Sequence, residues 1–349
     1  MITPLEDFLN LDIGTSWTKA FLVSAGQESS VKTTLKLPTS AEDLSFSTNL
    51  LIGKIVSKSK TPKIILTSTY NEAADLTKIF KASFVDKETV RNELFDWFSL
   101  QNFENPLILD GGASNYLRNF RVSDIGAYLS FPISETDLEN IIGNKSLRLE
   151  TIPEDRNQLE IEEAILRSSF NIIPELHNPA KFNTLIITGG ILSWSTETTR
   201  SALLLLDLMA AGKVVQVYRD DAAFLSSYGA LIAQKKNFKS QDLKTLKNMG
   251  CLVSLGGSGK VSLDYGLSEI QEVTISENEI ALIPATSSQK VELSIQGSEK
   301  IKFRVSGGEW GIILDGRIKP LALEFGQEKS RQAVLSWQQA LGKVQLLEI

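Results

Sequence analysis

Three glycine turns, each following a short apolar run, hold the residue types of this sequence that are best suited to binding phosphate. They are DIGTS at 12–16, DGGAS at 110–114 and TGG at 188–190. In the first turn, an aspartate ends an apolar strand, where leaving it unpaired is costly. The loop behind it offers N–H groups and hydroxyls to phosphate, and the carboxylate meets Mg²⁺ through water. For one such turn alone, an ordinary hairpin with a solvent-facing aspartate is the alternative interpretation.

Composition excludes several other kinds of chemistry. The chain has 349 residues and a formal net charge of −6, without a block of like charges, so nothing indicates a nucleic-acid or anionic-membrane partner. One cysteine, Cys251, and one histidine, His177, argue against disulfides, cysteine metal clusters and histidine-based triads. The start of the chain does not resemble a signal peptide, and the longest apolar run, 202–211, is too short to span a bilayer. We therefore expect no membrane span and a cytoplasmic protein.

The elements that must position these turns fall into a pattern that occurs twice. From the start we predict strands at 9–13, 18–24 and 30–37, then helices and strands in alternation at 41–57, 63–67, 71–80 and 87–100. From Pro106 the pattern restarts, with strands at 106–110, 116–122 and 126–131, helices at 135–142 and 159–169, then a strand, helix, strand and helix at 184–188, 196–210, 214–218 and 222–234. The sequence thus predicts an α/β protein with two similar domains, 1–105 and 106–234.

The last third of the chain changes character. A polar, lysine-rich segment predicts a linker at 235–248, and seven short alternating runs between 249 and 325 predict a β-rich module. A closing helix is expected within 326–349, where Val334, Trp337 and Leu341 share one face.

The three turns in this order resemble those of the actin, Hsp70 and hexokinase (ASKHA) ATPase superfamily. Within it, the chain resembles the glutamate mutase L (MutL-like) family, which is unrelated to the mismatch-repair protein. The first motif appears here as Asp12, Gly14, Thr15, Thr18 and Lys19, and a second stretch as Val122, Asp124 and Gly126. Further similar segments are 188–190, 219–221, 228–231, the tail 307–321, Arg331 and Trp337.

This resemblance implies two ribonuclease-H-like domains that face each other across a cleft holding Mg-ATP. It implies that Asp12 and Asp110 hold Mg²⁺, mostly through water, and that Asp110 orients the attacking water. It assigns phosphate binding to Gly14, Thr15, Ser16, Gly112, Ala113 and Ser114, and adenosine binding to Gly189 and Gly190. Lys19 is a further phosphate ligand or, as the alternative, a solvated charge.

Three functions are consistent with these features. The first is an ATP-binding accessory or chaperone-like factor with a protein partner, which by resemblance is a cobalamin-dependent mutase. The second is a scaffold or filament-forming protein with degenerate catalysis, and the third is a small-molecule kinase. The sequence shows no Glu or Gln placed on a connecting helix to position water, so ATP hydrolysis stays an open question.

Overall fold

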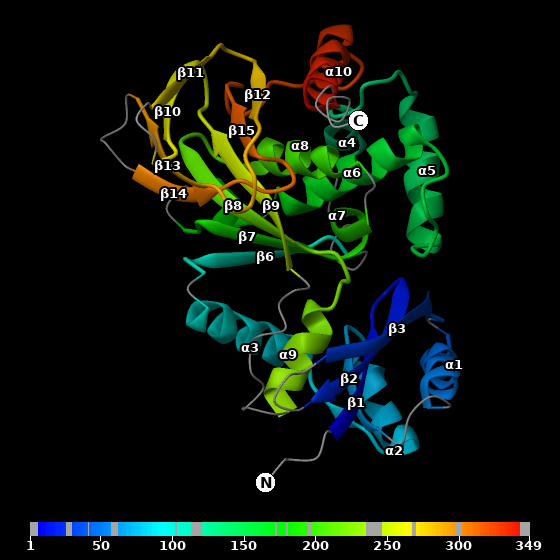
Figure 1. The fold of residues 1–349 in the computed structure, drawn as a ribbon. Coiled ribbons are helices and arrows are strands. Elements are labelled where there is room, and N and C mark those ends of the chain that lie inside the picture. Colours follow the sequence, from blue (N-terminus) through cyan, green and yellow to red (C-terminus); the bar gives the residue numbers. More distant parts are fainter. Residues whose placement is uncertain are drawn as a thin grey trace.

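The computed structural model describes residues 6–25, 30–40, 42–56, 62–101, 103–112, 121–171, 173–178, 181–194, 197–234, 246–266, 270–296 and 302–342. Over these residues the protein is a mixed α/β structure with three sheets (Figure 1). Within the described part of the chain, none of the helices combines the length and the apolar character needed to cross a bilayer.

The first sheet has five strands in the order β3-β2-β1-β4-β5. Its strands are β1 (Glu6–Ile13), β2 (Trp17–Ala25), β3 (Ser30–Pro38), β4 (Lys63–Ser68) and β5 (Ser83–Phe84). The first three form an antiparallel meander, and β4 and β5 run parallel to β1. The meander and the alternation after it were both predicted, because each strand carries its own apolar period and each turn its own polar residues.

Helices cover both faces of this sheet. On one face, α1 (Leu44–Val56) and α2 (Leu76–Phe80), joined to β4 by a short 3₁₀ turn (Asn71–Asp75), pack against Leu9, Leu11 and Ile13. On the other face, Phe8 packs among residues of α3 (Lys87–Leu100) and α9 (Leu225–Gln234). Side chains alternate along a strand, so Asp12 shares the face of Phe8 and points toward α3.

The second sheet has six strands in the order β12-β15-β9-β8-β7-β6. These are β6 (Pro106–Asp110), β7 (Thr184–Thr188), β8 (Lys213–Asp220), β9 (Leu246–Ser254), β12 (Ile280–Ile283) and β15 (Ile312–Asp315). The first three are mutually parallel, which brings the ends of β6 and β7 to the same edge. Strand β9 is antiparallel to β8 and parallel to β15.

A helical layer covers one face of the second sheet and forms the largest apolar core. It contains α4 (Val122–Gly126), α5 (Glu135–Leu147), α6 (Arg156–Phe170), α7 (Gly190–Trp194), α8 (Thr198–Leu208) and α10 (Glu328–Gly342), with a 3₁₀ turn at Pro174–His177. In α10, Val334, Trp337 and Leu341 are buried in this core, as the helical period predicted.

Two parts of the molecule cover the opposite face of the second sheet: the third sheet, and the helices α3 and α9. The four-stranded third sheet, in the order β11-β10-β13-β14, covers β8, β9, β12 and β15 through a separate apolar core. Its strands are β10 (Gly259–Asp264), β11 (Gln271–Ile275), β13 (Lys290–Ile295) and β14 (Lys302–Ser306). Nearer β6, this face contributes Ile108 and Ile186 to the core formed with α3 and α9. Figure 1 shows α3 and α9 side by side between the first and second sheets.

Four predictions are corrected by this topology. The segment 249–325 is not a separate β-rich module, because β9, β12 and β15 complete the second sheet. The predicted linker 235–248 ends earlier, since β9 begins at Leu246, and residues 235–245 lie outside the described part. Helix α9, assigned with 106–234, packs with α3 against the first sheet. Strand pairing joins distant segments, and alternation in one run does not specify its neighbour.

The fourth correction concerns the strands predicted at 116–122 and 126–131. Residues 113–120 lie outside the described part, Val122–Gly126 is the helix α4, and 127–131 contains no strand. Ile125 and Leu129, four residues apart, are both buried in the helical layer, so the segment follows a helical rather than a strand period. In such a short run the two periods are difficult to distinguish.

Candidate functional site

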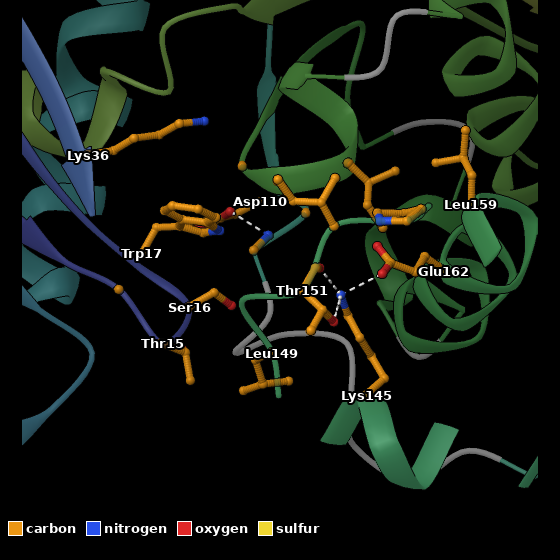
Figure 2. Close-up of a pocket in the computed structure, with 18 of the residues that line it drawn as sticks. Thr15, Ser16, Trp17, Lys36, Asp110, Lys145, Leu149, Thr151, Leu159 and Glu162 are labelled. Atoms are coloured by element: carbon orange, nitrogen blue, oxygen red, sulfur yellow. Dashed lines mark hydrogen bonds and ion pairs between the residues drawn. The ribbon is translucent and has the colours of Figure 1, made fainter. Parts of the chain in front are cut away.

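A cavity of about 550 Å³ lies between the first and second sheets, where the ends of β1 and β6 face each other. We call its two sides the first wall, from residues 12 to 87, and the second wall, from residues 110 to 197. The first wall consists of Asp12, Gly14, Thr15, Ser16, Trp17, Lys19, Lys36, Thr69 and Lys87. Figure 2 shows Trp17 and Lys36 on one side and Lys145, Thr151 and Glu162 on the other.

The structure brings together most of the residues predicted for the site. Asp12 and Asp110 line this one cavity from opposite walls. With them are Gly14, Thr15, Ser16, Lys19, Gly112, Gly189 and Gly190. The remaining two, Ala113 and Ser114, lie outside the described residues. The roles assigned to all of these residues stay predictions.

The turn between β1 and β2 is held in place by hydrogen bonds to the end of β3. The Gly14 N–H donates to the Trp17 carbonyl at 3.1 Å. The Thr39 hydroxyl donates to the Gly14 carbonyl at 2.8 Å, and the Thr39 N–H donates to the Ser16 carbonyl at 2.9 Å. Among the described residues, the buried Ser16 hydroxyl has no hydrogen-bond partner, and Figure 2 shows it directed into the cavity. The turn is therefore preorganised, with a hydroxyl available to a ligand.

Asp12 is buried and ion-paired with two lysines of its own wall. Lys87 Nζ lies 2.6 Å from Asp12 Oδ1, and Lys19 Nζ lies 3.6 Å from Oδ2. Burial acts to raise the pKa of Asp12, but the charges of Lys87 and Lys19 outweigh it and lower the pKa overall. Asp12 is therefore an ionised carboxylate whose two oxygens both face ammonium groups.

Local structure explains how Lys87 reaches Asp12. Asp86 caps α3 by accepting a hydrogen bond from the Thr89 N–H at 2.8 Å, so Lys87 is the first residue of the helix. The Lys87 ammonium also donates to the Ser226 hydroxyl of α9. Lys87 thus links the first strand to both helices that lie between the sheets. No sequence motif indicates that Lys87 contacts Asp12, because the contact depends on the packing of α3 beside β1.

The second glycine turn and the third are in direct contact. Gly111 N–H donates to the Thr188 carbonyl at 2.8 Å, and Gly112 N–H donates to Asp110 Oδ1 at 2.8 Å. A Cβ on Gly189, whose φ is +79°, would lie 2.1 Å from Asp110 Oδ1 and 2.7 Å from Gly112 N. A Cβ on Gly190 would lie 2.9 Å from the Gly111 carbonyl oxygen. These two glycines are therefore required by the approach of the neighbouring turn, independently of any adenosine.

The second wall holds a buried ion pair that the sequence did not reveal. Lys145 Nζ of α5 lies 2.5 Å from Glu162 Oε1 of α6, and the Lys145 ammonium also donates to the Thr151 carbonyl. Burial raises the pKa of Glu162, and the neighbouring Lys145 only partly offsets this. Beside the pair, Leu149, Ile152, Leu159 and Ile191 supply an apolar surface. Two helices bring these residues together, and no short motif marks them.

A buried aspartate supports the second wall from behind. Asp220, at the end of β8, accepts hydrogen bonds from the Thr188 hydroxyl and from the N–H groups of Phe224 and Leu225. Burial raises the pKa of its carboxyl. Asp220 is not a cavity residue; it joins the third turn to the start of α9.

The tail resemblance corresponds to a structural network away from the cavity. Arg317 donates to Asp315 at 2.7 Å and to Asp207 at 2.6 Å, and its guanidinium lies over the Trp337 ring. Arg167 donates to the other oxygen of Asp207 at 2.6 Å. These contacts connect the tail to α6 and α8. The tail motif therefore has a structural explanation that does not involve the cavity.

The residues that line the cavity fit Mg²⁺ only in part. Magnesium takes octahedral oxygen coordination, typically from one or two carboxylates together with phosphate oxygens and waters. Asp110 is exposed at the cavity edge and fits such a role. Asp12 does not, because lysine ammonium groups face both of its oxygens. Among the described residues, no group of three or more His, Cys, Asp or Glu is arranged to hold a metal.

Comparison with known proteins gives distant structural likenesses. No family model and no curated protein sequence matches the chain, so the glutamate mutase L resemblance stays a prediction. Component A of the Acidaminococcus fermentans (R)-2-hydroxyglutaryl-CoA dehydratase is 15% identical, with a TM-score of 0.39, over 67% of this chain and 100% of that one.

Two further solved structures have similar scores. The ADPNP-bound activator of the 2-hydroxyisocaproyl-CoA dehydratase from Clostridium difficile is 11% identical, with a TM-score of 0.36, over 68% of this chain and 98% of that one. The ethanolamine utilization protein EutJ from Carboxydothermus hydrogenoformans is 14% identical, with a TM-score of 0.39, over 66% of this chain and 90% of that one.

Proposed function

We propose that the protein is an actin-like nucleotide-binding protein that takes ATP in the cleft between its first and second sheets. The observation that carries this proposal is the meeting of the Asp12 and Asp110 turns in one cavity, beside three lysines. A volume of about 550 Å³ is within the range of small-molecule sites, roughly 300–1,000 Å³. The paired turns and lysines suit the phosphates, and the apolar part of the second wall suits the base.

The two walls then have different tasks. On the first wall, the Ser16 hydroxyl and the lysines bind phosphate oxygens. On the second wall, Leu149, Ile152 and Leu159 surround the base, and Glu162 accepts hydrogen bonds from ribose hydroxyls. In this arrangement the nucleotide bridges both walls and draws them together.

The biological role follows the resemblance, as an accessory or chaperone-like factor of the glutamate mutase L type. Closure of the cleft around ATP would change the surface offered to a protein partner such as a cobalamin-dependent mutase. A scaffold or filament-forming protein without turnover is the second candidate. The pairing of Asp12 with lysines supports it, because a carboxylate held in this way is not available to hold Mg²⁺ beside the phosphates.

Calorimetry with the full chain tests nucleotide binding directly. We expect ATP to bind with one-to-one stoichiometry and adenosine to bind more weakly, because the lysines of the first wall recognise phosphate. Absence of heat with ATP, ADP and GTP alike would reject the proposal. Phosphate release from ATP separates a slow ATPase from a protein that binds without turnover, and electron microscopy with ATP detects filaments.

A further inference from the structure

The two walls of the cleft carry opposite charge. Three lysines line the first wall, Lys19, Lys36 and Lys87, and Asp12 is the only acidic residue among its described lining residues. The second wall is mostly acidic: it has two basic residues, Lys145 and Arg156, against Asp110, Glu154, Asp155, Glu162 and Glu197. An anionic group in the cleft is therefore attracted to the first wall.

Strand register places two lysines of the first wall, Lys19 and Lys36, side by side, and helix α3 brings Lys87 to the other side of Asp12. Asp12 of β1 lies directly opposite Lys19 of β2, and Lys19 lies directly opposite Lys36 of β3. Like charges directly opposite each other on one face destabilise a sheet. Burial and the charge of Lys19 both lower the pKa of Lys36. This repulsion is removed when an anion lies between the two ammonium groups.

The contacts of Asp12 suit a different task from the one predicted for it. Its carboxylate holds Lys87 at 2.6 Å and Lys19 at 3.6 Å, and Lys87 is also fixed by Ser226. A carboxylate between two ammonium groups has little capacity left to attract the water shell of a divalent cation. It is, however, well placed to keep the two lysines extended toward the cavity.

We propose that Lys19, Lys36 and Lys87 neutralise the polyphosphate of the bound ligand, so that it binds without a divalent cation and Asp12 acts as a positioning residue for the lysines. The inference rests on the proposed function, because it concerns the same cleft. The Ser16 hydroxyl adds a neutral donor to the three ammonium groups. Magnesium held by Asp110 is then an addition to the site and not a requirement for binding.

Calorimetry of ATP binding in EDTA and in excess MgCl₂ tests this inference on the full chain. We expect dissociation constants that agree within about threefold, which corresponds to less than 1 kcal/mol. Binding in MgCl₂ that weakens about thirtyfold or more in EDTA would overturn the inference and leave the proposed function intact. No binding in either buffer would instead reject the proposed function, and the inference with it.

Lysine variants test which charges carry the affinity. Lys36→Met should weaken ATP binding in EDTA by about tenfold, as expected for loss of one charged contact. Lys32→Met is the matched control, since Lys32 is on the same strand but pairs with Asp7 and does not line the cavity. Equal affinity of the Lys36→Met and Lys32→Met variants would contradict the proposed role of the lysines.

Asp12→Asn separates a positioning residue from a metal ligand. If Asp12 orients the lysines, affinity should fall by the same factor in EDTA and in MgCl₂. If it holds the metal, affinity should fall in MgCl₂ only, and the inference is then wrong. Thermal unfolding of the variant checks that it folds, and the Lys36→Met comparison remains decisive if it does not.

Discussion

The two walls of the cleft are built by different means, although they line the same cavity. The first wall is built mainly on one sheet: Asp12, Lys19 and Lys36 lie on neighbouring strands in direct register, and Lys87 is added by helix α3. The second wall is assembled from three separated segments, 110–112, 145–162 and 189–197. Ladder hydrogen bonds thus position two of the three lysines on the cationic side, Lys19 and Lys36, whereas buried ion pairs and close glycine contacts position the acidic side.

The largest expected effect comes from the ion pairs behind the second wall. Arg200 binds Glu163 through two nitrogens, at 2.9 and 2.7 Å, and lies 3.6 Å from Glu160. Arg200→Met leaves both buried carboxylates without this guanidinium, and we expect a loss of about 3–5 kcal/mol in the free energy of unfolding. Denaturation in urea measures it.

A surface ion pair provides the control for that variant. Arg331 pairs with Glu328, whose side chain is 64% exposed, so Arg331→Met should cost less than about 1 kcal/mol. Similar losses for the two variants would show that buried ion pairs do not hold the second wall.

The contact between the glycine turns should give the next largest effect. Gly189→Ala places a Cβ 2.1 Å from Asp110 Oδ1, whereas Gly212→Ala, at a similar φ of +75°, meets nothing within 4 Å. Both variants place alanine in a left-handed backbone conformation, which is unfavourable to a similar extent in each. The difference between their free energies of unfolding therefore isolates the close contact. We expect Gly189→Ala to cost about 1–3 kcal/mol more in free energy of unfolding, as overpacking does. Equal costs would mean that the turns separate easily.

Opposite pKa shifts give the walls opposite responses to pH. The pKa of Asp12 is lowered, so its contribution to stability is present above the unfolded value of 3.8 and is lost as the pH falls below it. The pKa of Glu162 is raised, so the folded state keeps its proton above 4.5 and stability falls as pH rises through that window.

Stability measured against pH for two variants checks these signs. The difference between wild type and Asp12→Asn should change below pH 3.8, and the difference between wild type and Glu162→Gln should change above pH 4.5. A common window for both would contradict the opposite environments of the two walls.

The smallest effect concerns how far the repulsion between Lys19 and Lys36 lowers the free energy of unfolding in the absence of ligand. Lys36→Met removes a like-charge pair across β2 and β3 and should raise the free energy of unfolding by about 0.5 kcal/mol at low salt. The gain should fade at high salt, because exposed charges are screened. Added ATP should reverse the order, since only the wild type keeps all three lysines. A variant less stable than wild type without ATP would contradict the repulsion.

Much of the site was predictable because its turns are local. Asp12, Gly14 and Ser16 lie within five residues, and turn chemistry together with apolar periodicity was sufficient to place them at a strand end. The parallel strands β6 and β7 brought the turns after them to one edge, as predicted for an α/β sheet. The predictions were wrong where strand pairing was needed, as in β9, β12 and β15.

The sequence by itself determined which residue types stand in each turn, since a glycine, a hydroxyl or a carboxylate at a strand end can be recognised from its immediate neighbours. Only the tertiary structure decided what those residues face. It placed Lys87 against Asp12, Lys36 across from Lys19, and Gly189 beneath Asp110. The physical reason is that apolar periods and turn preferences act over a few residues, whereas electrostatic partners are chosen by strand register and helix packing across the whole chain.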